Sequence, residues 1–173
     1  MASLVNLALP DCCLNRKTRY DCGKRAGSAR ERFVGKIIVT GASGQFGNAA
    51  ARMLLERVPA EDLVLLSRTP ESLADLAERG AHVRRADFDE PGSLLPAMEG
   101  GEKMLLISGT RVGYRVIQHK AAIDAAASVG VRHIAYTSVV GISPDNPAIV
   151  IKDHGPTEEM MRMSGMAWTA LRD

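Results

Sequence analysis

The chain has 173 residues, a net charge of +2, 46% hydrophobic residues and 4% aromatic residues. This length and composition favour a single aliphatic α/β domain over a β-sandwich. The sequence contains no 18 consecutive apolar residues, so we expect no membrane partner. Residues 36–173 carry a small net negative charge, so we also expect no nucleic-acid partner.

Residues 1–35 show neither helical nor strand periodicity and are net basic. We interpret residues 1–35 as a disordered or spurious N-terminal tail and residues 36–173 as the folded domain, because acidic residues in the tail argue against a transit peptide. The tail holds every cysteine of the chain: Cys12, Cys13 and Cys22. The domain itself therefore lacks thiol chemistry, and we expect a cytoplasmic protein.

The first predicted strand, residues 36–40, leads into a glycine-rich loop and then a predicted helix at residues 48–58. A pyrophosphate must approach backbone N–H groups closely, and Cβ atoms would block it, so the glycines predict a dinucleotide-phosphate site. The helix N-terminus favours the same anion. A turn without a ligand is the alternative, because glycine-rich turns are common. The candidate contacts in the loop are Gly41, Ser43, Gly44, Gln45, Phe46 and Gly47.

The second predicted strand, residues 63–67, is apolar throughout, as expected for a parallel sheet covered on both faces. It ends at Ser67-Arg68 and carries no acid that could accept a hydrogen bond from the ribose 2′-OH of NAD. A guanidinium suits a 2′-phosphate, so we predict NADPH as the cofactor and NADH as the less favoured one. The alternative is that Arg68 is a solvated loop cation.

A helix is predicted at residues 71–78 and a third strand at residues 81–86, where Arg84 and Arg85 indicate a sheet edge. A further helix starts at residues 89–91, which combine acidic side chains with proline. The remaining elements are a strand at residues 103–108, a helix at 117–130, a strand at 132–138, a helix at 156–163 and a strand at 167–171.

Strands that alternate with helices require right-handed crossovers and predict an α/β, Rossmann-type doubly wound parallel sheet. We expect the strand order 3-2-1-4-5-6, with the ligand at the carboxyl ends of strands 1 and 4. Ser108 and Gly109 follow strand 4, and their small side chains leave room for the ribose side of that ligand.

From Lys36 onward the chain resembles the NmrA-like branch of the atypical short-chain dehydrogenase/reductases, most closely its NAD(P)H:quinone oxidoreductases. The resemblance rests on residues 39–47, on Ala135-Tyr136-Thr137-Ser138, and on the spaced residues His154, Thr157, Glu158, Ser164, Gly165, Thr169, Leu171 and Arg172. It implies a Rossmann domain followed by a substrate lobe, so we expect a C-terminally truncated chain with that lobe largely missing. The family usually has Asn where this chain has Asp173.

The resemblance also implies site roles for residues beyond the glycine loop. It places Asp87 and Phe88 beside the adenine, although a helix-capping loop is the alternative for them. It places Tyr136, Thr137 and Ser138 at the cofactor site, with His154 and Glu158 shaping it. His154 and Glu158 share a helix face without a third ligand, so we predict no metal.

The catalytic residues stay unassigned, because the usual pair of a tyrosine and a lysine four residues later is missing from residues 36–173, and Tyr20 with Lys24, which have this spacing, lie in the tail. Tyr136 is followed at that spacing by Val140, and Tyr114 by Gln118. The candidates are Tyr136, Ser138 and His154.

We expect hydride transfer from NADPH to a small quinone-like acceptor, because a hydroquinone anion is a weak base and needs little general-acid help. An NADP(H)-binding redox sensor that reports to a protein partner without turnover is the alternative, as is an inactive fragment. A nucleotide-sugar epimerase is a third option, disfavoured by the missing tyrosine and lysine pair.

Overall fold

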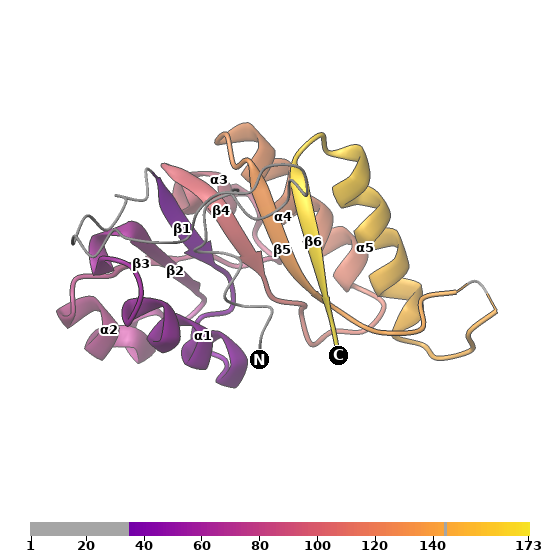
Figure 1. The fold of residues 1–173 in the computed structure, drawn as a ribbon, viewed down its shortest axis with the longest axis horizontal. Helices are drawn as coiled ribbons and strands as arrows, with labels where there is room; N and C mark the ends of the chain where they lie inside the picture. Colours follow the sequence, from indigo (N-terminus) through magenta and orange to yellow (C-terminus); the bar gives the residue numbers. More distant parts are fainter. Residues whose placement is uncertain (1–34, 144) are drawn as a thin grey trace, which may run out of the picture.

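The computed structural model describes residues 35–143 and 145–173. The predicted tail therefore lies, apart from Gly35, outside the described residues. The described residues form a six-stranded parallel sheet in the order β3-β2-β1-β4-β5-β6 (Figure 1). This order confirms the predicted Rossmann-type topology, including the edge position of the third strand. The strands are β1 (Lys36–Val39), β2 (Leu63–Ser67), β3 (His82–Arg85), β4 (Gly101–Leu106), β5 (His133–Ser138) and β6 (Ala167–Arg172).

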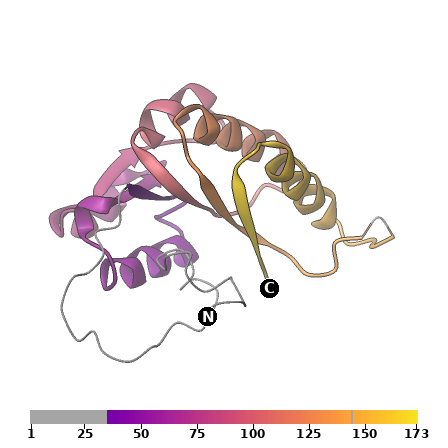
Figure 2. The same ribbon diagram turned by 45° about the horizontal axis from the view of Figure 1, so that its top comes forward.

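Helices cover both faces of the sheet (Figure 2). They are α1 (Gln45–Leu55), α2 (Ala74–Glu78), α3 (Leu94–Met98), α4 (Arg115–Ser128) and α5 (Ile151–Met163), with 3₁₀ turns at Ala60–Asp62, Pro70–Leu73 and Pro91–Ser93. Side chains alternate between the two faces along each strand. In β1, Ile37 and Val39 pack with α1 and α2, whereas Ile38 packs with α3, α4 and α5. This alternation explains why β2 and the carboxyl-terminal parts of β1 and β4 carry apolar side chains on both faces.

The structure corrects several predicted boundaries. Helix α1 begins at Gln45 rather than residue 48, because Gly44 is its N-cap. Helix α5 begins at Ile151, five residues before Pro156, so the predicted start at the proline is wrong. Pro156 removes one backbone hydrogen bond there, while buried Asp153 and His154 pack that first part of the helix against the core. Strand β4 ends at Leu106, which leaves Ile107 and Ser108 in the following loop.

Candidate functional site

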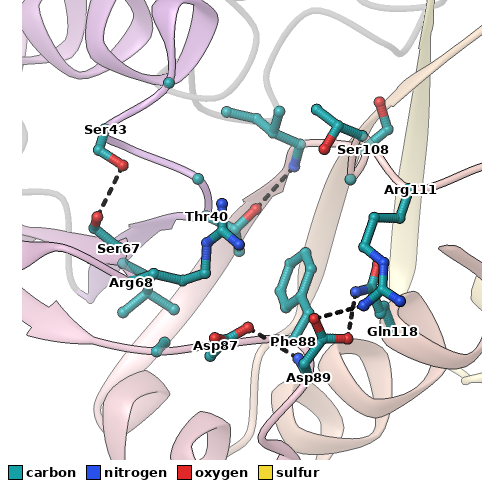
Figure 3. A pocket seen from close by; sticks show the side chains of 17 residues that line it. Thr40, Ser43, Ser67, Arg68, Asp87, Phe88, Asp89, Ser108, Arg111 and Gln118 are labelled. Carbon is teal, nitrogen blue, oxygen red and sulfur yellow. Dashed lines mark hydrogen bonds and ion pairs between the residues drawn. The ribbon is translucent and has the colours of Figure 1, made fainter. Parts of the chain in front are cut away.

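A pocket of about 440 Å³ lies where β1, β2, β3 and β4 end and their loops begin (Figure 3). This is the edge of the sheet at which the sequence predicted a ligand. The lining consists of Thr40, Gly41, Ser43, Gly44, Leu66, Ser67, Arg68, Ala86, Asp87, Phe88, Asp89, Ile107, Ser108, Gly109, Thr110, Arg111 and Gln118.

The glycine loop has a backbone that side chains would disrupt. Gly41 has φ +59°, in the left-handed region that favours glycine. A Cβ on Gly47 would lie 2.2 Å from the Gly41 carbonyl oxygen, and a Cβ on Gly44 would lie 3.2 Å from the same atom. The three glycines therefore serve the tight turn and the close packing of α1 on the loop, as a dinucleotide-phosphate site requires.

The N-terminus of α1 adjoins this loop, and no side chain of its first turn competes with an anion for its N–H groups. Its N-cap, Gly44, makes no side-chain cap hydrogen bond, and the first turn holds no acidic residue. The first N–H groups of a helix have no partner within it, and the helix dipole is positive at this end. The geometry of the glycines and this helix end together fit a diphosphate.

The end of β2 contributes a cation and a pair of hydroxyls. Ser67 donates a hydrogen bond to Ser43 across 2.8 Å, and the Thr69 N–H donates to the Ser67 hydroxyl across 3.0 Å. The exposed Arg68 side chain extends into the pocket, and within the described residues it forms no ion pair or hydrogen bond (Figure 3). These groups are suited to an anion that lies next to β2.

The loop after β3 is held in shape by its own hydrogen bonds and also contributes residues to the pocket lining. Asp87 accepts a hydrogen bond from the Asp89 N–H across 3.0 Å, and the Asp87 N–H donates to Ser93 across 3.0 Å. Asp87 therefore shapes the loop that precedes α3, but it caps neither the 3₁₀ turn at Pro91–Ser93 nor α3, whose N-caps are Glu90 and Ser93. Asp87 and Phe88 also line the pocket, where the resemblance placed them beside the adenine.

Asp89 links two loops across the pocket. Its carboxylate accepts a hydrogen bond from Gln118 at 2.8 Å and pairs with Arg111 at 2.8 Å (Figure 3). The bond from Gln118 and the charge of Arg111 lower the pKa of Asp89. The loop after β3 and the loop after β4 are thereby held together on one side of the ligand space.

Tyr136 and His154 lie behind the pocket, between β5 and α5, and neither contributes to its lining. The Tyr136 hydroxyl lies 2.8 Å from His154 Nδ1, and Tyr136 is fully buried. Burial raises the pKa of Tyr136 well above its usual value, so this hydroxyl keeps its proton at neutral pH. Burial, together with the nearby Arg115 charge, lowers the pKa of His154.

Ser138 and Thr137 also lie outside the lining and serve as supports. Ser138 donates a hydrogen bond to Glu158 across 2.6 Å, and Glu158 also pairs with Arg172 at 2.6 Å. Thr137 accepts a hydrogen bond from the Ser108 N–H across 2.8 Å, which holds the pocket residue Ser108 in place.

The lining contains many of the residues that the sequence singled out, and some that it missed. Those brought together are Gly41, Ser43, Gly44, Arg68, Asp87, Phe88, Ser108 and Gly109. Outside it are Gln45, Phe46, Gly47, Tyr136, Thr137 and Ser138. Thr40 directly precedes Gly41, and Ser67 directly precedes Arg68, so these predicted site residues pointed to both. Asp89 directly follows Phe88 and had the same signal, whereas Arg111 and Gln118 had none, because their contacts with Asp89 join separate segments of the chain.

Two further findings concern metals and membranes. Within residues 35–143 and 145–173, no three His, Cys, Asp or Glu side chains gather in a group that could hold a metal ion. In the same part of the chain, every helix is too short or too polar to cross a bilayer.

The glycine-loop geometry agrees with what known proteins show. A sequence profile of the family described as NAD(P)H-binding matches residues 41–173. The chain belongs to this family, in its NmrA-like branch. Quinone oxidoreductase 2 of Escherichia coli (strain K12) is 40% identical over 79% of this chain and 48% of its own length.

Two further relatives extend the likeness. An NmrA-like family domain-containing oxidoreductase of Aspergillus flavus is 29% identical over 80% of this chain and 47% of its own length. The solved structure of Citrobacter sp. triphenylmethane reductase, complexed with NADP(H), superposes with a TM-score of 0.76 at 34% identity. That superposition covers 80% of this chain and 49% of the reductase. The chain thus spans about half the length of the relatives it matches.

Proposed function

We propose that the protein binds NADPH and transfers hydride to a quinone-like acceptor. The observation that carries this proposal is that one pocket combines the glycine turn at Gly41, the open N-terminus of α1 and the guanidinium of Arg68. Support also comes from the quinone oxidoreductase and the NADP(H)-bound reductase among the relatives.

Each part of the cofactor has a proposed place in the pocket. The diphosphate belongs at Gly44 and the start of α1, and a 2′-phosphate belongs at Arg68 with the hydroxyls of Ser43 and Ser67. Phe88 then offers an aromatic surface to the adenine half. The nicotinamide half belongs beside Ser108 and Gly109, on the β4 side. When bound, the reduced nicotinamide supplies a hydride.

Arg68 is the residue that favours NADPH over NADH. A charge-assisted hydrogen bond contributes about 1.5–3 kcal/mol, which corresponds to roughly 10- to 100-fold in affinity. An acid at the end of β2 would favour NADH instead, and Ser67-Arg68 supplies none.

The acceptor is argued from the acid–base groups near the pocket. The described lining contains no tyrosine, lysine or histidine that could protonate an alkoxide. Tyr136 is buried, with a raised pKa, behind the lining. A quinone suits such a pocket because its reduction gives a weakly basic hydroquinone anion, so water can supply the proton. The main contribution of the chain is then to hold donor and acceptor close together.

A redox sensor that binds NADPH without turnover is the second candidate. The observation that favours it is the position of Tyr136, Ser138 and His154 outside the lining. Such a sensor, or an inactive fragment, would bind the dinucleotide through the same residues, and a sensor would report to a protein partner.

Consumption of NADPH with a simple benzoquinone separates these functions. We expect the chain to oxidise NADPH only when quinone is present, as followed by the loss of reduced-nicotinamide absorbance. The Arg68→Ala variant should need a higher NADPH concentration, whereas Arg79→Ala, at the exposed end of α2, should match the wild type. Binding without turnover would favour the sensor, and absence of binding would contradict both functions.

The cytoplasm remains the proposed compartment. Residues 36–173 contain no cysteine, so the domain needs no oxidising environment to form.

A further inference from the structure

The Gly109 peptide group is held on both sides by α4. The Gly109 N–H donates to His119 Nε2 across 3.1 Å, and the Gly109 carbonyl accepts a hydrogen bond from Arg115 Nε. Gly109 lines the pocket in the loop after β4, where the nicotinamide half of the cofactor is expected. The position of this lining peptide therefore depends on two side chains that do not line the pocket themselves.

The bonds around His119 define its tautomer. A backbone N–H can only donate, so His119 Nε2 must accept and carries no proton. Nδ1 of the same ring lies 3.0 Å from the Thr157 hydroxyl, which itself donates to the Asp153 carbonyl across 2.8 Å. The Thr157 hydrogen is thus used, so the ring must donate from Nδ1–H. A single chain of hydrogen bonds runs from Gly109 through His119 to α5.

The surroundings of His119 keep this ring neutral. It is fully buried, with the rings of Phe88 at 6.2 Å and Tyr136 at 5.4 Å between centroids. Its pKa is lowered to about 4, mainly by burial and also by the charges of His154 and Arg115, while Asp153 opposes them. At neutral pH, Nε2 is therefore available as an acceptor.

We propose that His119, as the neutral Nδ1–H tautomer, is a positioning residue that fixes the Gly109 peptide in the cofactor pocket and couples it to α5. In this proposal, only the identity of the ligand rests on the proposed function. The hydrogen bonds between the His119 ring, Gly109 and α5 do not depend on it.

Two substitutions separate positioning from simple packing. In His119→Gln the amide oxygen reaches the position of Nε2 and can still accept from Gly109. In His119→Asn the amide reaches only the position of Nδ1, so the bond to Thr157 is kept and the bond to Gly109 is lost. We expect His119→Gln to bind NADPH within about threefold of the wild type and His119→Asn about tenfold more weakly. His82→Asn, at the exposed edge strand, should not change binding.

Nuclear magnetic resonance on the full wild-type chain supplies a second test that needs neither turnover nor a folded variant. We expect the ¹⁵N shifts of the His119 ring to show the Nδ1–H tautomer at neutral pH and the Gly109 amide to exchange slowly. An Nε2–H tautomer or a fast Gly109 amide would overturn the proposal, as would equal NADPH affinity of the Gln and Asn variants. Failure of the wild type to bind NADPH would contradict the proposed function instead, and the ring tautomer would still decide the role of His119.

Discussion

Gly47 illustrates how a single missing side chain shapes the pocket without lining it. A Cβ at this position would lie 2.2 Å from the Gly41 carbonyl oxygen and 2.9 Å from Ala42 Cα, and both are backbone atoms that cannot move aside. The loop and α1 can approach each other only because this position is glycine.

We therefore predict that Gly47→Ala destabilises the protein by about 1–3 kcal/mol, despite the better helix propensity of alanine. Urea unfolding measures the difference. Gly92→Ala is the matched control, because a Cβ there meets nothing within 4 Å. Equal stability of the two variants would show that the loop and helix can separate without cost.

His119 gives a second prediction at this scale, through the pH dependence of unfolding. Its pKa is about 4 in the folded protein and 6.5 in the unfolded chain. As the pH falls, the unfolded chain therefore binds this proton at a higher pH than the folded protein does. The free energy of unfolding decreases between pH 6.5 and pH 4 by on the order of 3 kcal/mol. The charged and titratable groups that face this ring are unchanged in the His119→Gln variant used below; they are His154, Arg115 and Asp153.

Denaturant unfolding of the wild type and of His119→Gln, measured from pH 4 to 8, isolates this contribution. We expect the wild type to lose more stability than the variant across this window. Parallel curves would mean that His119 binds protons equally in both states.

Part of the site was predictable from single residues and part was not. Gly41 and Arg68 can be predicted from their immediate sequence neighbours. Gly41 lies in a turn that favours glycine, and Arg68 directly follows a predicted parallel strand. Arg111 gave no such signal, since its ion pair with Asp89 joins loops 22 residues apart. The positions of Tyr136 and His154 behind the lining also depend on how α5 packs, which a local pattern does not contain.

At the scale of elements, α5 joins the last two strands through a buried polar face. Asp153, His154, Thr157 and Glu158 are all buried on it. Their partners come from the loop before α4 and from α4, β5 and β6, so the polar side chains hold the helix in one orientation. The sequence predicts that this helix starts at Pro156, and proline is favoured in the first turn of a helix. The tertiary contacts of Asp153 and His154 extend it further towards the N-terminus.

We predict that Glu158→Gln weakens this packing and lowers stability by about 1–2 kcal/mol at neutral pH. Burial raises the pKa of Glu158, but the hydrogen bonds from Arg172 and Ser138 outweigh it and lower the pKa below 4.5. Its contribution is therefore present above pH 4.5 and is lost as the pH falls through the lower folded value.

Thermal unfolding at pH 7 and pH 3.5 tests this sign. The difference in Tm between the wild type and Glu158→Gln should be smaller at the lower pH. Glu159→Gln is the control, because Glu159 is an exposed neighbour whose surface ion pair with Arg162 contributes little. A Tm difference that stays constant with pH would contradict this role of Glu158.

At the scale of the whole molecule, the topology places the ends of four strands around one pocket. The strand order followed from alternating strands and helices, because parallel strands need right-handed crossovers. The chain spans about half the length of the relatives it matches. We propose that the residues around this pocket are sufficient to bind NADPH.

Binding should appear first as stabilisation of the folded chain. NADPH at 100 times its Kd is expected to add about 2.7 kcal/mol to the free energy of unfolding, if it binds only the folded state. Thermal unfolding with and without NADPH measures this effect. An unchanged Tm at saturating NADPH would show that the pocket is not a dinucleotide site.

The most direct measurement is calorimetric titration of the wild type and of Arg68→Ala with NADPH and with NADH. We predict that the wild type binds NADPH about 10- to 100-fold more tightly than NADH, and that Arg68→Ala loses this preference while its affinity for NADH is unchanged. Equal affinities of the wild type for the two dinucleotides, or a preference that survives the loss of Arg68, would contradict the account.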